Sequence, residues 1–462
     1  MFSSPKLERA IQERLFFWGV LFISYVSALY VRFEVSDLIQ VYSDSLSPYL
    51  AAGRFLNLGF SEPPNPEADH WLWVTAVPQV LVSTSLQDIF FFRTLISALV
   101  APIGAAIIWE MSDRDKMLSS LLGGVVLAAD QGLVDTLLSS FRGYMAPEWV
   151  GIASLFFALG FKNAKLWCFV PALLVIAGGH HPLALGALLS TPLFLIWGSK
   201  SGSWRWIIVL FLGASLPRLF WMFQIAQCDA GGLECFTQIA TGSSEQNGFL
   251  ELIYRGYKEH FVYSWGTAGA VLSLGVFFSR AKVRWLVIAF TLGITALGLS
   301  LTTFRPYHLR IVSVPLIAFG VAGWTYFYWG KWLVLMCSIW FLASTPAPSG
   351  VAGATVWHDA RGAELLQLSR PLWLEGTVES ELSVSASGVV FSAWLQGLPK
   401  EALSKKPKEN ITVLLPKGLM YVGTVEQAHI YLQQLTNNEG GFVGGHDWAT
   451  VFFKAEEVEL EW

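Results

Sequence analysis

Charged side chains are scarce in this sequence. Asp, Glu, Lys and Arg make up 14% of its 462 residues, and hydrophobic residues make up 54%. Soluble globular chains carry about 25% charged residues, and the mean hydropathy here is +0.50. Because so few charges cannot cover a surface in water, the apolar excess is expected to face lipid. The composition excludes an ordinary soluble domain and predicts an integral membrane protein.

An excess of positive charge is also missing, since the formal net charge is −4. Without a basic face to neutralise phosphates, nucleic acid is excluded as a partner. The four cysteines are too few for a disulfide framework. Cys168 and Cys337 lie inside apolar runs and are expected to be packed thiols, whereas Cys228 and Cys235 flank one polar loop. That pair could form a disulfide if the loop faces an oxidising compartment.

Apolar runs recur along the chain, and no internal repeat relates one half to the other. The first run has no small-residue cleavage site, so we expect it to remain as a membrane span. Lys and Arg gather in every second loop, as expected for the cytoplasmic side. The sequence therefore predicts about eleven transmembrane helices, at residues 15–33, 89–109, 117–134, 148–161, 166–179, 183–198, 205–226, 263–279, 285–303, 311–328 and 332–346.

The opposite, extracytoplasmic side receives the longer segments. These are residues 34–87, the 135–147 loop, the loop that begins at Cys228, and the tail after residue 346. An apolar stretch inside 34–87 is too short and too interrupted by Pro78 to span, and is expected to lie in the membrane interface. Alternating strand patterns around one helical pattern predict a small α/β domain over residues 347–462, after a transmembrane domain over 1–346.

Several motifs follow one another in order. Asp44 comes directly after the first span, then Pro63 and Pro64, and then Arg93 in the stretch FFFRTLISALVAPIGAAIIWE. Glu148 follows in SSFRGYMAPEWVGIASLFFALG, and the last motif is TTFRPYHLRIVSVPLIAFGVAGW. Over about three-quarters of the chain, this order resembles the GT-C superfamily of membrane glycosyltransferases. The protein-mannosyltransferase, aminoarabinose-transferase and oligosaccharyltransferase-like members are the most similar types.

The resemblance implies a GT-C-like fold and a polyprenyl-phosphate-linked sugar donor. Its acceptor would be a glycan, a lipid or a protein, and membrane lipid would surround the site. Asp44 would act as the base, with Glu148 second; alternatively, Asp44 is a helix N-cap and Glu148 a first-turn carboxylate that follows Pro147. No cofactor is assigned. The lone Asp44 and the lack of an Asp-rich signature leave a divalent metal open.

Stabilising the departing phosphate requires cations or strong hydrogen-bond donors. The candidates on the predicted external side are Arg305, His308, Arg310, Arg218, His70 and Arg142. Arg218 has an alternative role as the structural partner of Asp130 or Asp135. The adjacent His180 and His181 lie at a predicted external turn, where at most one of them is expected to be functional.

Two other functions remain open. A transporter or flippase would use intramembrane charges such as Asp130 and Arg218 as a substrate path. A non-catalytic scaffold would keep the fold without the chemistry. The compact loops favour a bacterial inner membrane, with the site and the tail on the periplasmic side.

Overall fold

A computed structural model describes most of the helical part of the chain and short stretches elsewhere. The described residues are 5–34, 40–41, 81–82, 86–138, 145–199, 202–226, 265–300, 306–344, 384–385, 389–394, 411–414, 420–423 and 448–453. The chain divides into two compact units. The first comprises Met1–Arg32, Ile96–Val134 and Gly143–Ala347; the second comprises Phe33–Leu95, Asp135–Arg142 and Pro348–Trp462.

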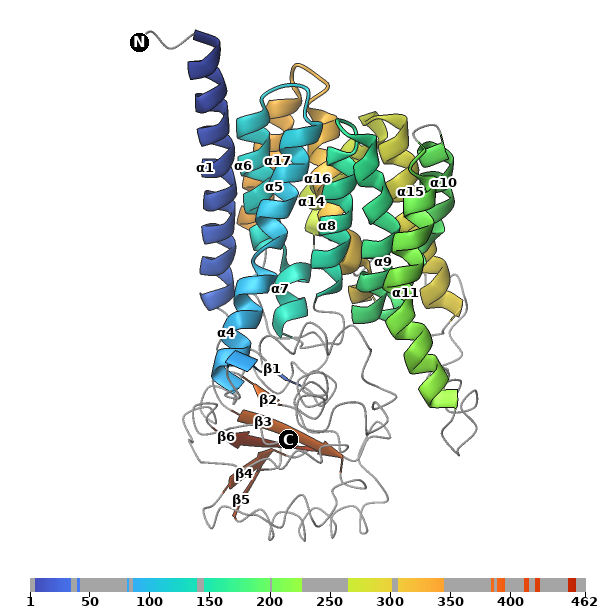
Figure 1. Cartoon of the computed structure of the whole chain (residues 1–462). Coiled ribbons are helices and arrows are strands. Elements are labelled where there is room, and N and C mark those ends of the chain that lie inside the picture. The colour runs from blue at the N-terminus through green and yellow to red at the C-terminus, as the bar shows by residue number, and fades with distance from the viewer. Residues whose placement is uncertain are drawn as a thin grey trace. The chain divides into compact units, whose positions relative to one another are not determined.

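The described part of the first unit is helical (Figure 1). Three of the described helices have residues in both units: α1 (Pro5–Glu34), α4 (Leu86–Ser97) and α7 (Gln131–Leu138). The remaining helical elements are α5 (Val100–Met111), α6 (Lys116–Ala129), α8 (Ala146–Leu159), η2 (Ala164–Cys168), α9 (Phe169–His180), η3 (Pro182–Ser190), α10 (Thr191–Ser199), α11 (Trp204–Ala226), α14 (Gly266–Leu274), η5 (Gly275–Phe278), α15 (Ala281–Ser300), η6 (Pro306–Val312), α16 (Ser313–Trp324) and α17 (Gly330–Ser344).

Each apolar run of the sequence coincides with one of these helices or with two consecutive ones. Two helical stretches, Ile11–Phe33 and Phe91–Met111, are long and apolar enough to cross a membrane by length and composition. The other apolar helices are shorter, and several are interrupted by turns or 3-10 segments. A mostly helical, membrane-compatible architecture is therefore observed, while the number of crossings stays a prediction.

Proline marks where several helices begin. Pro102, Pro147, Pro171 and Pro315 each lie in the first turn of their helix, α5, α8, α9 and α16 respectively. The first turn has backbone N–H groups without an intrahelical acceptor, so the missing N–H of proline costs nothing there. These prolines thus set helix starts without breaking the helices that follow.

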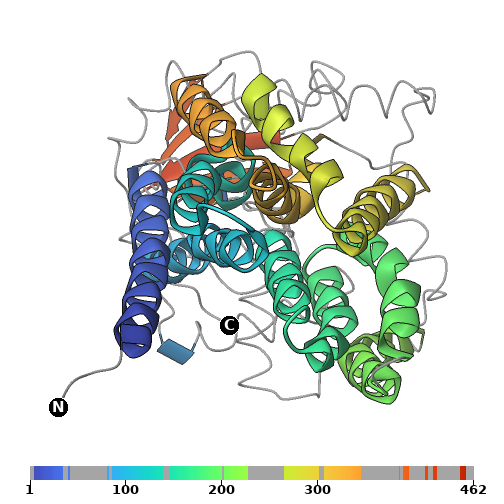
Figure 2. The ribbon, with the colours of Figure 1, turned by 90° about the horizontal axis from the view of Figure 1, so that it is seen from above.

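Helix α16 lies at the centre of the first unit. It contacts α5, α6, α8, α14, α15 and α17, and Figure 2 shows it end-on among them. Every residue of α16 except Leu316 is buried. A helix that is apolar on all sides must be surrounded by others, and its small residues let those neighbours approach closely.

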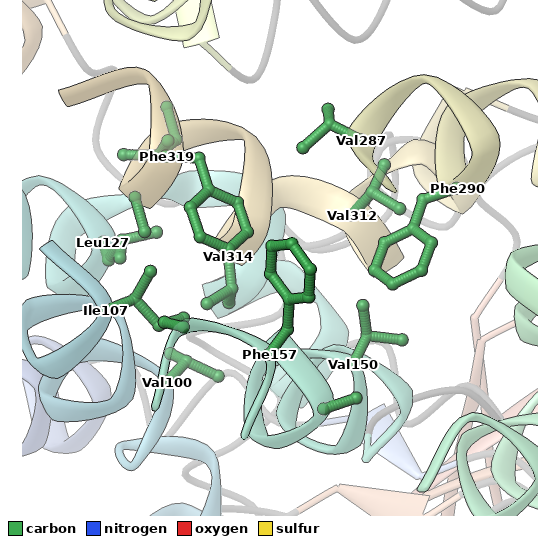
Figure 3. Packing of buried hydrophobic residues seen from close by; sticks show 14 of the residues in the cluster. Val100, Ile107, Leu127, Val150, Phe157, Val287, Phe290, Val312, Val314 and Phe319 are labelled. Atoms are coloured by element: carbon green, nitrogen blue, oxygen red, sulfur yellow. The ribbon is translucent and has the colours of Figure 1, made fainter. Parts of the chain in front are cut away.

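Large side chains from several helices interlock around this centre (Figure 3). Phe157 of α8 meets Phe319 of α16 edge to face, with ring centroids 5.9 Å apart and an interplanar angle of 89°. Val100, Val150 and Val314 pack in the same cluster, from α5, α8 and α16. Cys168 and Cys337 are buried free thiols, as predicted.

Glycines permit the closest helix contacts. A Cβ added at Gly186 of η3 would overlap the carbonyl group of Gly293 in α15, and one at Gly293 would overlap that of Gly186. A second close contact joins η5 and α16, where a Cβ added at Gly323 would overlap the carbonyl group of Gly275, and one added at Gly275 would overlap that of Gly320. At both contacts the backbones touch, so only glycine fits.

The second unit contains the described strands. β3 (Val389–Trp394), β6 (Trp448–Phe453), β4 (Ile411–Leu414) and β5 (Met420–Gly423) form an antiparallel sheet in the order β3-β6-β4-β5. Within the same unit, β1 (Gln40–Val41) pairs with β2 (Val384–Ser385). Three of the strand patterns predicted in the tail coincide with β3, β4 and β6. The predicted tail helix and final strand lie outside the described residues.

Candidate functional site: a buried charged cluster

Four charged side chains from distant parts of the sequence gather in the first unit. Arg32 is in the last turn of α1, Asp130 follows α6, Glu148 is in the first turn of α8, and Arg310 is in η6. Arg32 and Asp130 are fully buried, Glu148 is 4% exposed, and Arg310 is partly buried. We call these four residues the charged cluster. All four lie at helix ends.

Helix α1 brings Arg32 to the cluster on a stripe of buried residues spaced by four. Val20, Ser24, Ala28 and Arg32 are buried, whereas none of the intervening side chains is buried and four of them are exposed. This spacing places them on one helix face, and Ser24 lies against Gly124 of α6, where a side chain would overlap its hydroxyl. The rest of α1 leaves large apolar side chains on the surface.

The guanidinium of Arg32 is held by neutral and charged groups. Its Nε donates to the Ser97 hydroxyl at 3.0 Å, and Nη1 donates to the carbonyl oxygens of Ala28 and Ala128, each at 3.2 Å. It also interacts electrostatically with the carboxylates of Glu148 and Asp130. Arg32 thereby ties the end of α1 to the end of α6.

Asp130 terminates α6 and caps the helix that follows. Its Oδ1 accepts a hydrogen bond from the backbone N–H of Leu133 at 3.3 Å, and its backbone carbonyl accepts from Leu133 and Val134, each at 3.0 Å. Its Oδ2 accepts from the indole Nε1 of Trp265 at 3.0 Å. Both carboxylate oxygens therefore have defined donors, one local and one from the segment preceding α14.

Arg310 completes the cluster opposite Asp130, with which it interacts electrostatically. Gly132 lies between them: a Cβ placed there would be 3.0 Å from Asp130 Oδ1 and 3.1 Å from Arg310 Cγ. Such contacts are tighter than a normal side chain tolerates. The absence of a side chain at Gly132 lets the Arg310 stem lie close to the carboxylate.

Trp149, which follows Glu148 at the start of α8, makes an aromatic stack. The Trp149 indole stacks on His180, the last residue of α9, with ring centroids 6.0 Å apart and an interplanar angle of 20°. His180 is fully buried. The neighbouring His181 has a different role, because its Nδ1 accepts a hydrogen bond from the backbone N–H of Leu183 and caps η3. Of the two adjacent histidines, His180 belongs to the aromatic stack and His181 caps a helical turn.

The charges of the cluster balance. Two guanidinium groups and two carboxylates share a region in which burial excludes water and strengthens electrostatic interaction. Losing one member would leave its partners buried and uncompensated, a change that typically costs about 3–5 kcal/mol. The cluster is therefore both a structural junction of four helix ends and a preorganised set of acid and base groups.

No family model matches this chain, and no curated protein matches it significantly. The resemblance of its motifs to the GT-C superfamily accordingly stays a prediction. What the cluster can do follows from its own chemistry. A buried carboxylate can accept a proton, and arginines can hold phosphate oxygens through paired hydrogen bonds.

Two of the residues predicted from the sequence, Glu148 and Arg310, lie in this cluster. The backbones of His308 and Arg218 fall in η6 and α11, and their side chains lie outside the described residues. Arg93 is fully buried in α4. The remaining candidates also lie outside the described residues: Asp44, Arg305, His70, Arg142, Cys228 and Cys235.

Sequence reasoning missed Arg32 and Trp265. Arg32 falls in the predicted span 15–33 and Trp265 in the predicted span 263–279, and neither pattern assigns the side chain a role. A signal for Arg32 existed, since an arginine inside an apolar run is expensive unless it finds a partner. Within the described residues, no group of three or more His, Cys, Asp or Glu side chains is placed to hold a metal ion.

Proposed function

We propose that the chain is a multi-pass membrane glycosyltransferase of the GT-C type. It transfers a sugar from a polyprenyl-phosphate-linked donor to an acceptor on the extracytoplasmic side of a bacterial inner membrane. The observation that carries this proposal is the gathering of Arg32, Asp130, Glu148 and Arg310 at helix ends.

The exposed surface of the helices supports membrane insertion. Phe22, Trp206 and Trp340 are among many large apolar side chains that are more than half exposed. In water, so much apolar surface would drive association, whereas in lipid it is satisfied. The two long apolar helices, Ile11–Phe33 and Phe91–Met111, agree with this environment.

The alternation of spans supports a common membrane face for the cluster. Counting from a cytoplasmic N-terminus, the end of the first span, the end of the third, and the starts of the fourth and tenth all fall outside. Arg32, Asp130, Glu148 and Arg310 occupy these four positions in the same order. A common face permits the proximity of the four residues, whereas one span more or fewer between two of them would place them on opposite faces.

The cluster suits the proposed reaction. The acceptor hydroxyl oxygen attacks the anomeric carbon of the donor, and the bond from that carbon to the phosphate oxygen breaks. A carboxylate, Asp44 or Glu148, takes the hydroxyl proton. The polyprenyl phosphate leaves with the bonding electron pair, and Arg310 stabilises its charge.

The test measures polyprenyl phosphate released from polyprenyl-phosphate-linked sugars by the purified protein in lipid nanodiscs. Asp44→Asn, Glu148→Gln and Arg310→Gln are each expected to lower the rate by about 100-fold or more, as loss of a general base or a charge-stabilising donor does. The control is Glu110→Gln, which removes a carboxylate paired with Lys162 outside the cluster. Parallel reactions with EDTA decide whether a divalent metal is required.

Absence of release from every lipid-linked sugar, with wild-type behaviour of all three variants in cells, would contradict the enzyme proposal. The buried charges would then favour the transporter alternative, for which Asp130 and Arg32 are among the buried ionisable groups. Reconstituted vesicles loaded with fluorescent lipid-linked sugar distinguish this case, because a flippase moves the label between leaflets without cleaving it. If neither release nor movement occurs, a scaffold role remains.

A further inference from the structure

We infer that Asp130 is a positioning residue that holds Arg310 in place for the donor phosphate, with Trp265 and Gly132 making that contact specific. The inference rests on the proposed function and assigns a role to a residue that sequence reasoning treated only as a structural or transport charge. Asp130 itself would touch neither the sugar nor the phosphate.

The carboxylate of Asp130 is fixed from two directions. The Leu133 N–H holds Oδ1 at 3.3 Å from within the same turn, and the Trp265 indole holds Oδ2 at 3.0 Å from a different segment. The side chain of Trp265 is itself 2% exposed. With donors on both oxygens, the carboxylate is held in one orientation, so the direction of its negative charge is set before any ligand binds.

Arg310 lies beside this fixed carboxylate. Its side chain is long and has several rotatable bonds, so a fixed neighbouring charge narrows the orientations that it adopts before a ligand binds. The η6 backbone fixes only where the side chain begins. Arg310 interacts electrostatically with Asp130, and its Cγ would lie 3.1 Å from a Cβ added at Gly132, so its stem runs against the turn that carries Asp130.

The neighbouring charges have other attachments. Arg32 is held by Ser97, Ala28 and Ala128, so it does not depend on Asp130 alone for its orientation. Glu148 acts electrostatically on Arg32. Asp130 interacts electrostatically with Arg310.

The experiment is a double-mutant cycle on binding of polyprenyl phosphate, the product of the proposed reaction, to the full chain in nanodiscs. The variants are Asp130→Asn, Arg310→Gln and both together, and neutral polyprenol is the control ligand. Asp130→Asn is expected to weaken polyprenyl phosphate binding by about tenfold, which corresponds to a lost charge-assisted contact. In the Arg310→Gln background it should have no further effect, and polyprenol binding should stay unchanged in every variant.

Two further variants separate positioning from mere stability. Trp265→Phe removes the donor to Oδ2 and keeps an aromatic ring. Gly132→Ala removes no polar group and inserts a methyl between Asp130 and Arg310. Both are expected to weaken phosphate binding in the same direction as Asp130→Asn, and both effects should vanish in the Arg310→Gln background. Glu110→Gln, at an ion pair outside the cluster, should leave binding unchanged.

The outcomes are distinct. One outcome is that Asp130→Asn weakens polyprenyl phosphate binding equally in the wild-type and Arg310→Gln backgrounds and lowers thermal stability in both. That result would assign Asp130 a structural role and overturn the inference. If the wild-type protein binds no polyprenyl phosphate, the proposed function fails. The same three variants of the double-mutant cycle are then compared by thermal unfolding. If their effects on stability add, Asp130 and Arg310 do not interact and the inference is overturned. If the effects do not add, the interaction of Asp130 with Arg310 stands, without a role in phosphate binding.

Discussion

Arg32 is the residue at which the cost of burying charge is clearest. It is fully buried in the last turn of α1, a helix whose surface is otherwise largely apolar. An isolated guanidinium could not remain there, because its desolvation would exceed any gain from packing. Its hydrogen bonds to Ser97, Ala28 and Ala128, with the charges of Glu148 and Asp130, offset that cost.

We predict that Arg32→Gln destabilises the protein strongly. The substitution leaves the carboxylates of Asp130 and Glu148 with less compensating charge, which typically costs about 3–5 kcal/mol for a buried network. Thermal unfolding in detergent, followed by tryptophan fluorescence, measures the loss. Arg14→Gln is the matched control, since Arg14 lies on the same helix and is exposed. Equal unfolding temperatures for the two variants would contradict a stabilising role of Arg32.

At this scale the sequence predicted part of the cluster. Glu148 and Arg310 could be named, because a carboxylate after a proline at a helix start and an arginine before an apolar run are visible as patterns. Arg32 carries a signal as an arginine in an apolar run, but its partners could not be named, and Trp265 carries no such signal, since both roles depend on distances across the bundle. The Trp265 to Asp130 hydrogen bond joins residues 135 positions apart, and spacing along the chain carries no information on such a pair.

At the scale of elements, hydropathy located the helices well and their interruptions badly. The run expected at 89–109 is divided between α4 and α5 by a turn at residues 98–99, and the run at 183–198 is a 3-10 segment followed by α10. Apolar composition measures partition into lipid. It does not register a local change from α-helical to 3-10 hydrogen bonding, so boundaries and breaks had to come from the structure.

Helix contacts made through glycine give a prediction at this scale. Gly186→Ala should destabilise the protein by about 1–3 kcal/mol, the usual cost of overpacking, because the new Cβ would overlap the Gly293 carbonyl of α15. Gly293→Ala should act alike. The control is Gly213→Ala in α11, where nothing lies within 4 Å of the added Cβ. Thermal unfolding of the three variants tests this, and an equal response of Gly186 and Gly213 would show that the backbones do not touch.

At the scale of the whole molecule, the grouping of segments is informative. The second compact unit collects Phe33–Leu95, Asp135–Arg142 and Pro348–Trp462, which overlap three of the four segments that charge distribution assigned to the outside. The side of the membrane that these segments occupy is the part of the proposal that a direct measurement can decide.

The topology predicts that Ser199 and Ser344 lie on opposite sides of the membrane. Both serines are exposed at helix ends and donate to a backbone carbonyl three or four residues earlier, so serine-to-cysteine substitution is equally mild at each. With Cys228 and Cys235 replaced by serine, the remaining Cys168 and Cys337 are buried. A membrane-impermeant maleimide should label Ser344→Cys in right-side-out vesicles and Ser199→Cys in inverted vesicles. Labelling of both in the same vesicle orientation would require an even number of crossings between them, and would remove the common external face on which the proposed site depends.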